Sequence, residues 1–162
     1  HFNRLVWHRH PRVKQRLNQL QAAEIATRGV GATRGALRDA LTLFDENGAL
    51  WPDAPPLLAD ALVTRDWQAL FVAQRALWRQ HRFEVFGHAL LEHLATAPRK
   101  GLTAHVLLGD PLSLTPAEWA RKPFLPLPVL GIPGWWPANE DPAFYEDKRV
   151  FRPAPLKGKA KP

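Results

Sequence analysis

Residues 124–153, FLPLPVLGIPGWWPANEDPAFYEDKRVFRP, combine many aromatic and apolar side chains with prolines at 126, 128, 133, 137, 142 and 153. The apolar residues follow neither the helical nor the strand period, and a disordered tail would be poor in them. Because proline fixes φ and removes a backbone donor, the segment can form neither a long helix nor a central strand. We therefore expect it to wrap around the rest of the protein as a long ordered segment.

The middle of this segment places aromatic and polar side chains next to each other. Trp135 and Trp136 are adjacent, and Asn139 and Glu140 follow closely. Long loops in compact proteins are usually functional, and binding residues are frequent on them. We therefore predict that Trp135, Trp136, Asn139 and Glu140 bind a ligand.

The net charge of +7 is concentrated at the two ends of the 162-residue chain. Such basic ends can contact nucleic acid or an anionic lipid surface, or they can simply be solvated. The length suits one domain with a real hydrophobic core. We predict a single domain over residues 1–155, truncated at its N-terminus, and a disordered basic tail over residues 156–162.

The chain contains no cysteine, which excludes disulfides, thiolate metal sites and cysteine nucleophiles. Any metal ion would need His, Asp, Glu or Asn ligands. No apolar run approaches the roughly 20 residues of a transmembrane helix, so we expect a soluble, cytoplasmic protein.

Apolar residues at helical spacing predict helices over residues 11–28, 57–63, 67–78 and 83–95, with a short helix after the Thr115-Pro116 capping signal. Residues 41–51 alternate around Asn47-Gly48 and predict a β-hairpin. The predicted fold class is mainly α (α+β): a single helical domain with a small β-hairpin and the C-terminal wrap. Its predicted core consists of Trp67, Leu70, Phe71, Leu77, Phe86 and Leu90.

Glu24 lies in the middle of the apolar stripe of the helix over residues 11–28, within about 40° of Val13 and Leu17. An unpaired carboxylate there would be costly to bury. Glu24 is therefore either a catalytic group or a structural partner of Arg34 or Arg38.

Two histidines are further catalytic candidates. Glu84, His88 and Glu92 are spaced at i, i+4 and i+8, so two carboxylates would flank His88 on one helix face, a pattern also common on solvated faces. His105 lies in an apolar run over residues 102–108, where a histidine is either a hydrogen-bonded core residue or a functional group.

Asp45 and Glu46 are adjacent carboxylates beside the predicted turn, so they are candidate ligands of a divalent cation, although turn acids are often only solvated. Arg34 and Lys100 are candidate partners for an anionic group of a ligand. The chain lacks the motifs GxGxxG, GxxxxGK[ST], GxSxG and HExxH, which gives little support to nucleotide binding, a serine hydrolase triad or a zinc protease.

Long phrases of the chain resemble the bacterial DUF3025 family of uncharacterised proteins. The phrases are FNRLVWHRHPRVKQRLNQLQAAEIATRGV, RGALRDALTLFDENGAL, DWQALF, FGHALLEHL, KGLTAH and PLPVLGIPGWWPANEDPAFYEDKRVFRP, in this order over nearly the whole chain. The resemblance implies that a Trp-His-Asp pattern of the family falls just before Phe2 and is cut away here. It supplies no activity and no catalytic residue.

These residues lead to a hydrolase hypothesis, in which Glu24, His88 and His105 form a His/carboxylate centre, with or without a divalent metal, that acts on a small or anionic substrate. One alternative is a nucleic-acid-associated module that uses the basic ends and tryptophan stacking. Another is a protein-interaction domain that docks through its tryptophan segment.

Overall fold

The structure is a computed structural model, and it describes residues 1–28, 35–80 and 82–155. The α-helices are α1 (Phe2–Arg9), α2 (Pro11–Arg28), α3 (Ala36–Asn47), α4 (Pro56–Thr64), α5 (His88–Thr96) and α6 (Pro116–Ala120). The strands are β1 (Gly48–Leu50), β2 (Glu84–Val85), β3 (Thr103–Leu107) and β4 (Leu125–Pro128). A π-helical segment (Ala69–Ala73) and 3-10 helices (Arg75–Gln80, Val129–Gly131, Pro137–Glu140 and Pro142–Glu146) complete the elements.

The mainly helical α+β class is confirmed. Helix α2 begins at Pro11 and ends at Arg28, as its apolar spacing predicts. Helix α6 begins with the predicted capping box, because the Thr115 hydroxyl accepts a hydrogen bond from the Glu118 N–H and the Glu118 carboxylate accepts one from the Thr115 N–H. Helix α1 was not predicted, although Phe2 and Val6 have helical spacing.

The predicted β-hairpin over residues 41–51 is wrong. Residues 41–47 belong to α3, whose buried residues Leu41 and Phe44 lie on one helical face. Gly48 follows the last helical residue, and its N–H donates to the Phe44 carbonyl. Asn47-Gly48 therefore marks the end of a helix, and glycine is required there because a Cβ atom at Gly48 would lie 2.5 Å from the Phe44 carbonyl oxygen.

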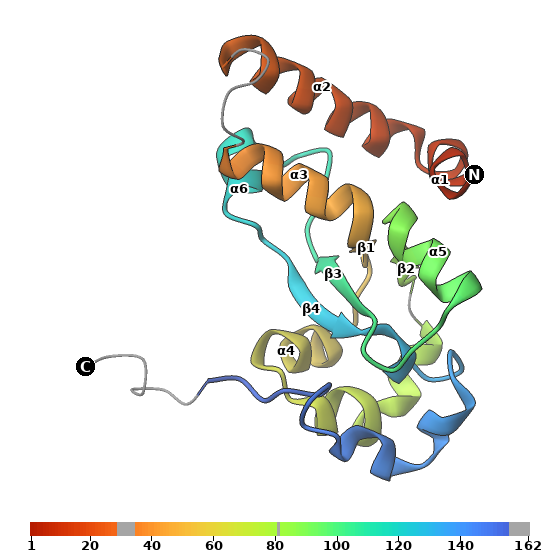
Figure 1. The fold of residues 1–162 in the computed structure, drawn as a ribbon. Helices are drawn as coiled ribbons and strands as arrows, with labels where there is room; N and C mark the ends of the chain where they lie inside the picture. Colours follow the sequence, from red (N-terminus) through yellow and green to blue (C-terminus); the bar gives the residue numbers. More distant parts are fainter. Residues whose placement is uncertain (29–34, 81, 156–162) are drawn as a thin grey trace.

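The strands form one four-stranded sheet in the order β2-β1-β3-β4 (Figure 1). Strands β1 and β3 are parallel, whereas β1 pairs antiparallel with β2 and β3 pairs antiparallel with β4. The helix predicted over residues 83–95 begins only at His88, because Glu84 and Val85 are drawn into the sheet as β2. Strand β4 lies at the sheet edge, where prolines are tolerated.

Two hydrophobic clusters lie against this sheet. Alternation along β3 sends Ala104 and Val106 into one cluster and Leu107 into the other. The first cluster includes side chains from α4, from residues 67–78 and from the C-terminal segment, together with Phe83, and it contains Trp67, Leu70, Phe71 and Leu90 of the predicted core. The second includes α1, α2, α3 and α6 in the upper part of Figure 1, and it contains Phe86.

The C-terminal segment is confirmed in part as an ordered wrap. It provides β4 and then three short 3-10 helices, and its side chains enter the first cluster. The large hydrophobic side chains that this segment buries include Leu127, Val129, Leu130, Ile132, Phe144, Tyr145 and Phe151. None of the helices in the described part of the chain has the length and apolar character that a membrane span requires.

Candidate functional site

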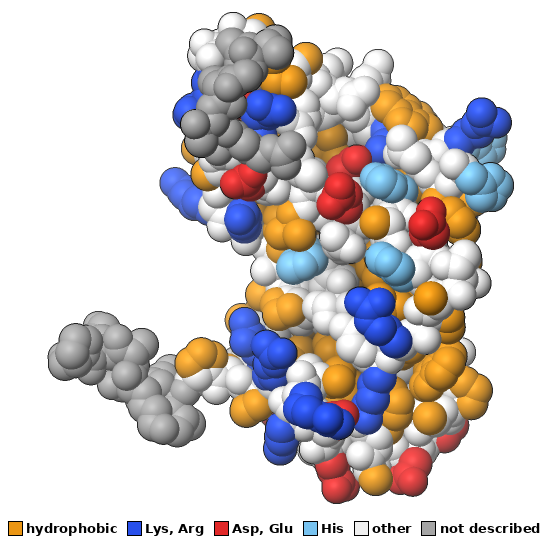
Figure 2. Space-filling model, in the orientation of Figure 1, with side chains coloured by type: hydrophobic (Ala, Val, Ile, Leu, Met, Phe, Trp, Pro, Cys, Tyr) orange, Lys and Arg blue, Asp and Glu red, His pale blue; other side chains and the backbone are white. Residues whose placement is uncertain are grey.

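Four helices meet at a group of polar side chains, which we call the four-helix site. It consists of Asn3 from α1, Lys14 from α2, Asp45 from α3 and His88 from α5. Histidine and acidic side chains gather on the face over α3 and α5, above a region rich in Lys and Arg (Figure 2). Two of the residues predicted from sequence, Asp45 and His88, are thus brought together.

Lys14 is the buried centre of this site. Its side chain is only 4% exposed, and its ammonium group donates to Asp45 Oδ1 at 2.6 Å and to Asn3 Oδ1 at 2.7 Å. The ammonium group also faces the Trp7 ring, 5.6 Å from its centroid. A buried ammonium group requires such partners, and they hold α1 and α3 against α2.

The second oxygen of Asp45 faces the imidazole. Asp45 Oδ2 lies 3.6 Å from His88 Nε2, and the two side chains are 32% and 31% exposed. A third of each side chain is therefore open to solvent, so a small molecule can reach the imidazole. A carboxylate that is fixed by Lys14 on one side can orient the imidazole on the other.

Gly87 explains how His88 comes so close to α3. A Cβ atom on this residue would overlap the backbone of Glu46 and Asn47. The N–H groups of Phe86 and Gly87 both donate to the Gly48 carbonyl at 2.9 Å. Helix α5 can therefore begin directly against the end of α3, which places His88 beside Asp45.

A second His/carboxylate pair lies beside the four-helix site. His10 Nε2 lies 3.1 Å from Glu84 Oε2, and Arg9 Nε donates to Glu84 Oε1 at 2.8 Å. Burial lowers the pKa of His10 more than the Glu84 carboxylate raises it, and the Arg9 charge lowers it further. The Phe86 ring lies 5.7 Å from the His10 ring and 6.0 Å from the Lys14 ammonium group, so it is a neighbour of both groups.

Glu24 does not join the four-helix site. It lies ten residues after Lys14, or about 15 Å along α2. Its carboxylate accepts from Arg28 Nε at 3.2 Å, one helical turn away. Arg28 is therefore a structural partner of Glu24. Of the two predicted partners, Arg34 lies outside the described residues, and no hydrogen bond or ion pair joins Arg38 to Glu24 within them.

His105 is on β3 and is paired in register with Gly48 and Pro126. Its ring lies 6.5 Å from the Phe124 ring. Burial lowers the pKa of His105, and the charge of Lys122 lowers it further. No contact joins it to Glu24 or His88 in the ranges that the structure describes, so the three predicted catalytic residues do not form one centre.

The predicted ligand-binding residues of the C-terminal half mostly make contacts within the protein. Lys100 lies 3.6 Å from the Asp147 carboxylate and 4.2 Å from the centre of the Phe144 ring. Asn139 is fully buried and donates to the carbonyls of Leu130 and Ile132, both at 2.8 Å. These contacts fasten the C-terminal segment.

The remaining predicted binding residues are more accessible. Glu140 is exposed and lies 3.6 Å from Arg75. Trp135 and Trp136 are half-buried against the first cluster, and they line a cavity of about 310 Å³ with Leu94 and Leu130. Arg34 lies outside the described residues.

The predicted metal ligands Asp45 and Glu46 lie in different environments. Asp45 is held by Lys14, whereas Glu46 is exposed. Across residues 1–28, 35–80 and 82–155, no three His, Asp or Glu side chains lie close enough together to hold one metal ion. The donors that the structure describes therefore do not fit a divalent cation at this site.

Sequence reasoning missed Lys14, Asn3 and the His10–Glu84 pair. Lys14 lies about 60° from Leu17 on the helical wheel, at the margin of the apolar stripe. This position was the sequence signal that could have identified Lys14 as a buried residue. Asn3 and His10 gave no comparable signal. The prediction that Glu84 flanks His88 on one helix face is wrong, because Glu84 lies on β2 and pairs with His10 and Arg9.

Removing one partner of the buried ion pair should cost more than removing both. Asp45→Leu is expected to lower the free energy of unfolding by about 2 kcal/mol, because the buried Lys14 ammonium group keeps only Asn3; partial exposure of Asp45 moderates the loss. Adding Lys14→Met should recover most of that loss. Urea unfolding of both single variants and the double variant measures this coupling, and strictly additive losses would contradict it.

Comparison with known families gives one match. A family model described as "Protein of unknown function (DUF3025)" matches residues 1–115 and 110–155. No curated protein and no solved structure matches the chain.

Proposed function

We propose that this chain, which belongs to the DUF3025 family, is a cytoplasmic hydrolase that uses His88 as its general base. The observation that carries the proposal is the convergence of Asn3, Lys14, Asp45 and His88 from separate helices. Surface histidines that have no function do not need a carboxylate fixed by a buried lysine. Ionisable groups that are brought together in specific pairs are concentrated at functional sites.

The proposed role of each residue is based on its contacts. Lys14 fixes Asp45 through Oδ1, and Asp45 Oδ2 orients the Nε2 side of His88. The other ring nitrogen, Nδ1, then accepts a proton from water, which attacks an ester, amide or phosphoester of the substrate. His88 returns this proton to the leaving group, so the imidazole is neutral again after each turnover.

The separation of 3.6 Å between His88 Nε2 and Asp45 Oδ2 is longer than a hydrogen bond. Catalytic hydrogen bonds are often long without substrate and tighten when it binds. Lys14 acts on Asp45 and has no free path to the substrate, so it is a positioning residue. No step of the proposed reaction passes through a metal ion, because the described donors do not form a metal site.

His88→Gln is expected to reduce hydrolysis at least about 100-fold, because glutamine cannot accept and return the proton. A panel of p-nitrophenyl esters and p-nitrophenyl phosphates provides the assay. His93→Gln is the matched control, since His93 is an exposed residue on the same helix. Glu24→Gln should also keep activity, because Glu24 pairs with Arg28 away from the site.

Two results would count against the proposal: full activity in His88→Gln, or an equal loss in His93→Gln. The melting temperature of each variant must stay close to that of the wild type for the comparison to hold. Absence of hydrolysis of every substrate in the panel by the wild-type protein would also count against it.

The observation behind the nucleic-acid alternative is the net charge of +7 together with the half-buried Trp135 and Trp136. A nucleic-acid module would bind an oligonucleotide with an affinity that falls steeply with salt. The interaction-domain alternative would need the same tryptophans to contact a partner. Both tryptophans already pack against the core, which leaves each less surface to offer.

A further inference from the structure

A cavity of about 430 Å³ opens between the end of α4, the sheet edge and the C-terminal segment. Its lining includes the arginines Arg65, Arg149 and Arg152 together with Trp67, Gly101, Thr103, Pro126, Pro128 and Val150. None of the described residues in this lining is acidic. We call this cavity the arginine pocket, and it shares no residue with the four-helix site.

Arg65 enters the pocket from the end of α4. Its backbone is left-handed, with φ of 53°, because it forms the C-cap of that helix and donates its N–H to Leu62. Glycine or asparagine is the usual residue at such a position. Within the part of the chain that the structure describes, no hydrogen bond or ion pair engages the Arg65 guanidinium group. An arginine at this costly backbone position therefore has no partner for its guanidinium group among the described residues.

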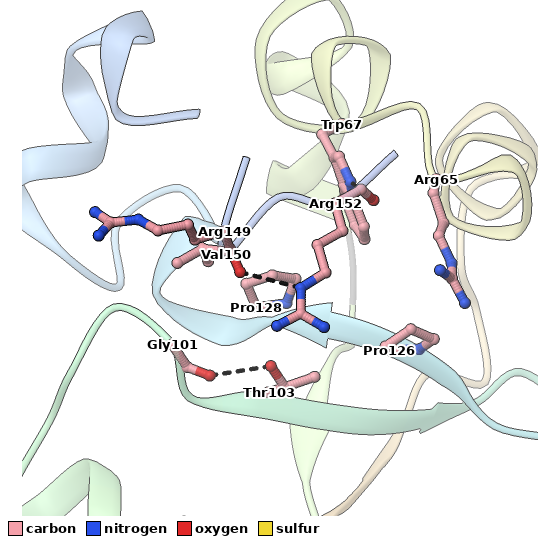
Figure 3. A pocket seen from close by; sticks show the side chains of 9 residues that line it. All are labelled: Arg65, Trp67, Gly101, Thr103, Pro126, Pro128, Arg149, Val150 and Arg152. Atoms are coloured by element: carbon pink, nitrogen blue, oxygen red, sulfur yellow. Dashed lines mark hydrogen bonds between the residues drawn. The ribbon is translucent and has the colours of Figure 1, made fainter. Parts of the chain in front are cut away.

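Arg152 enters from the C-terminal segment and is held in place at two points. Its carbonyl accepts a hydrogen bond from the Trp67 indole N–H at 2.6 Å, and its Nε donates to the Arg149 carbonyl at 3.1 Å. These contacts leave the two terminal nitrogens of the guanidinium group without an acceptor among the described residues. Figure 3 shows the side chains of Arg65 and Arg152 extending from different segments toward β4.

Arg149 differs from the other two arginines. Its guanidinium group pairs with the Asp147 carboxylate at 3.3 Å, its side chain is 91% exposed, and it points away from the other two (Figure 3). Asp147 also lies 3.6 Å from Lys100. The nearby carboxylate is therefore already engaged by Arg149 and Lys100, and no carboxylate in the described ranges forms an ion pair with Arg65 or Arg152.

We propose that the arginine pocket binds a small organic phosphate, with its phosphate group between Arg65 and Arg152. Guanidinium groups match the geometry of phosphate oxygens, and two of them suit a dianion. The volume is typical of a small-molecule site and exceeds the needs of a bare phosphate ion. Pro126, Pro128 and Val150 supply the apolar surface for the rest of the molecule.

A small ligand fits these observations better than a nucleic acid does. Arg65 and Arg152 line the same cavity, whereas Arg149, whose side chain is 91% exposed, is paired with Asp147. A nucleic-acid surface would instead need a row of unpaired cations along the path of the backbone.

The test uses phenyl phosphate as the probe, with isothermal titration at low salt. The wild-type protein should bind one equivalent, and more tightly than it binds inorganic phosphate, because the phenyl group covers apolar surface. Arg65→Asn and Arg152→Gln should each weaken binding at least about tenfold. Asparagine tolerates the left-handed backbone of Arg65, and glutamine keeps the Arg152 carbonyl that Trp67 uses, so both variants should stay folded.

Arg149→Gln is the matched control and should change the affinity less than about twofold. The Arg149 guanidinium group is exposed and already paired with Asp147, so its charge should contribute little to the binding of phenyl phosphate. His88→Gln should change the affinity less than about twofold, because His88 does not line the arginine pocket. A loss in His88→Gln as large as in Arg65→Asn would place the probe at the four-helix site and overturn the proposal. Absence of binding to the wild type, or an equal loss in Arg149→Gln, would overturn the proposal. Tighter binding of a single-stranded oligonucleotide through Arg65 and Arg152 would overturn it in favour of a nucleic-acid surface.

Discussion

Replacing Gly87 with alanine is expected to lower the free energy of unfolding by roughly 3 kcal/mol, because the added methyl group has no space. The new Cβ would overlap backbone atoms of Glu46 and Asn47, which cannot rotate away as a flexible side chain can. Either the end of α3 or the start of α5 must therefore shift. For a protein of this size, the melting temperature should fall by about 6–12 °C.

Gly101→Ala is the matched control, since nothing lies within 4 Å of a Cβ atom at that position. Thermal unfolding followed by circular dichroism measures both variants. The same displacement should separate His88 from Asp45, so Gly87→Ala should also lose hydrolase activity at temperatures where it remains folded. Equal melting temperatures for Gly87→Ala and Gly101→Ala would show that α5 does not approach α3 as closely as described.

Replacing Asn139 with leucine should have an effect of similar size, about 3 kcal/mol, through lost hydrogen bonds. Its side chain amide donates to the Leu130 and Ile132 carbonyls, and its Oδ1 accepts from Arg75 Nη2 at 2.8 Å. Leucine has a similar volume but satisfies none of these groups, and the Leu130 carbonyl would be left buried without a donor.

The control for this change is Asn18→Leu, because Asn18 is exposed on α2. Urea unfolding should show a lower midpoint for Asn139→Leu and little change for Asn18→Leu. The C-terminal segment should also become more susceptible to limited proteolysis in Asn139→Leu. The Asn139 side chain links residues 130 and 132 of this segment to Arg75, and these links would be lost. Unchanged stability would mean that Asn139 is free to serve as the ligand-binding residue that its sequence setting predicts.

The sequence predicted those elements whose signals are local. Pro11 and the apolar spacing after it mark α2, and Thr115 with Glu118 marks the start of α6. Asn47-Gly48 was ambiguous, because glycine after a helix and glycine in a tight turn give the same local pattern. Glu84 and Val85 were assigned to a helix because their pairing with β1 depends on residues far away in the chain.

For the candidate site, too, the sequence was informative only where the signal was local. His88 and Asp45 were recognised as ionisable residues in suggestive settings, but nothing local joins residues from α3 and α5. Lys14 belongs to the basic N-terminal end of the chain, for which contact with an anionic partner or solvation was expected, whereas its ammonium group is buried between Asn3 and Asp45. Glu24 had the stronger sequence signal, yet a neighbour one turn away already satisfies it.

The prolines of β4 also bear on how the protein behaves when it is concentrated. Pro126 is paired in register with His105, and Pro128 is paired with Thr103. Because the two prolines are two residues apart, their backbone nitrogens, which carry no hydrogen, point to the same side of the strand. That side faces away from β3 at the edge of the sheet. A strand from another molecule would find no donors there, so this edge resists intermolecular strand addition and fibril growth.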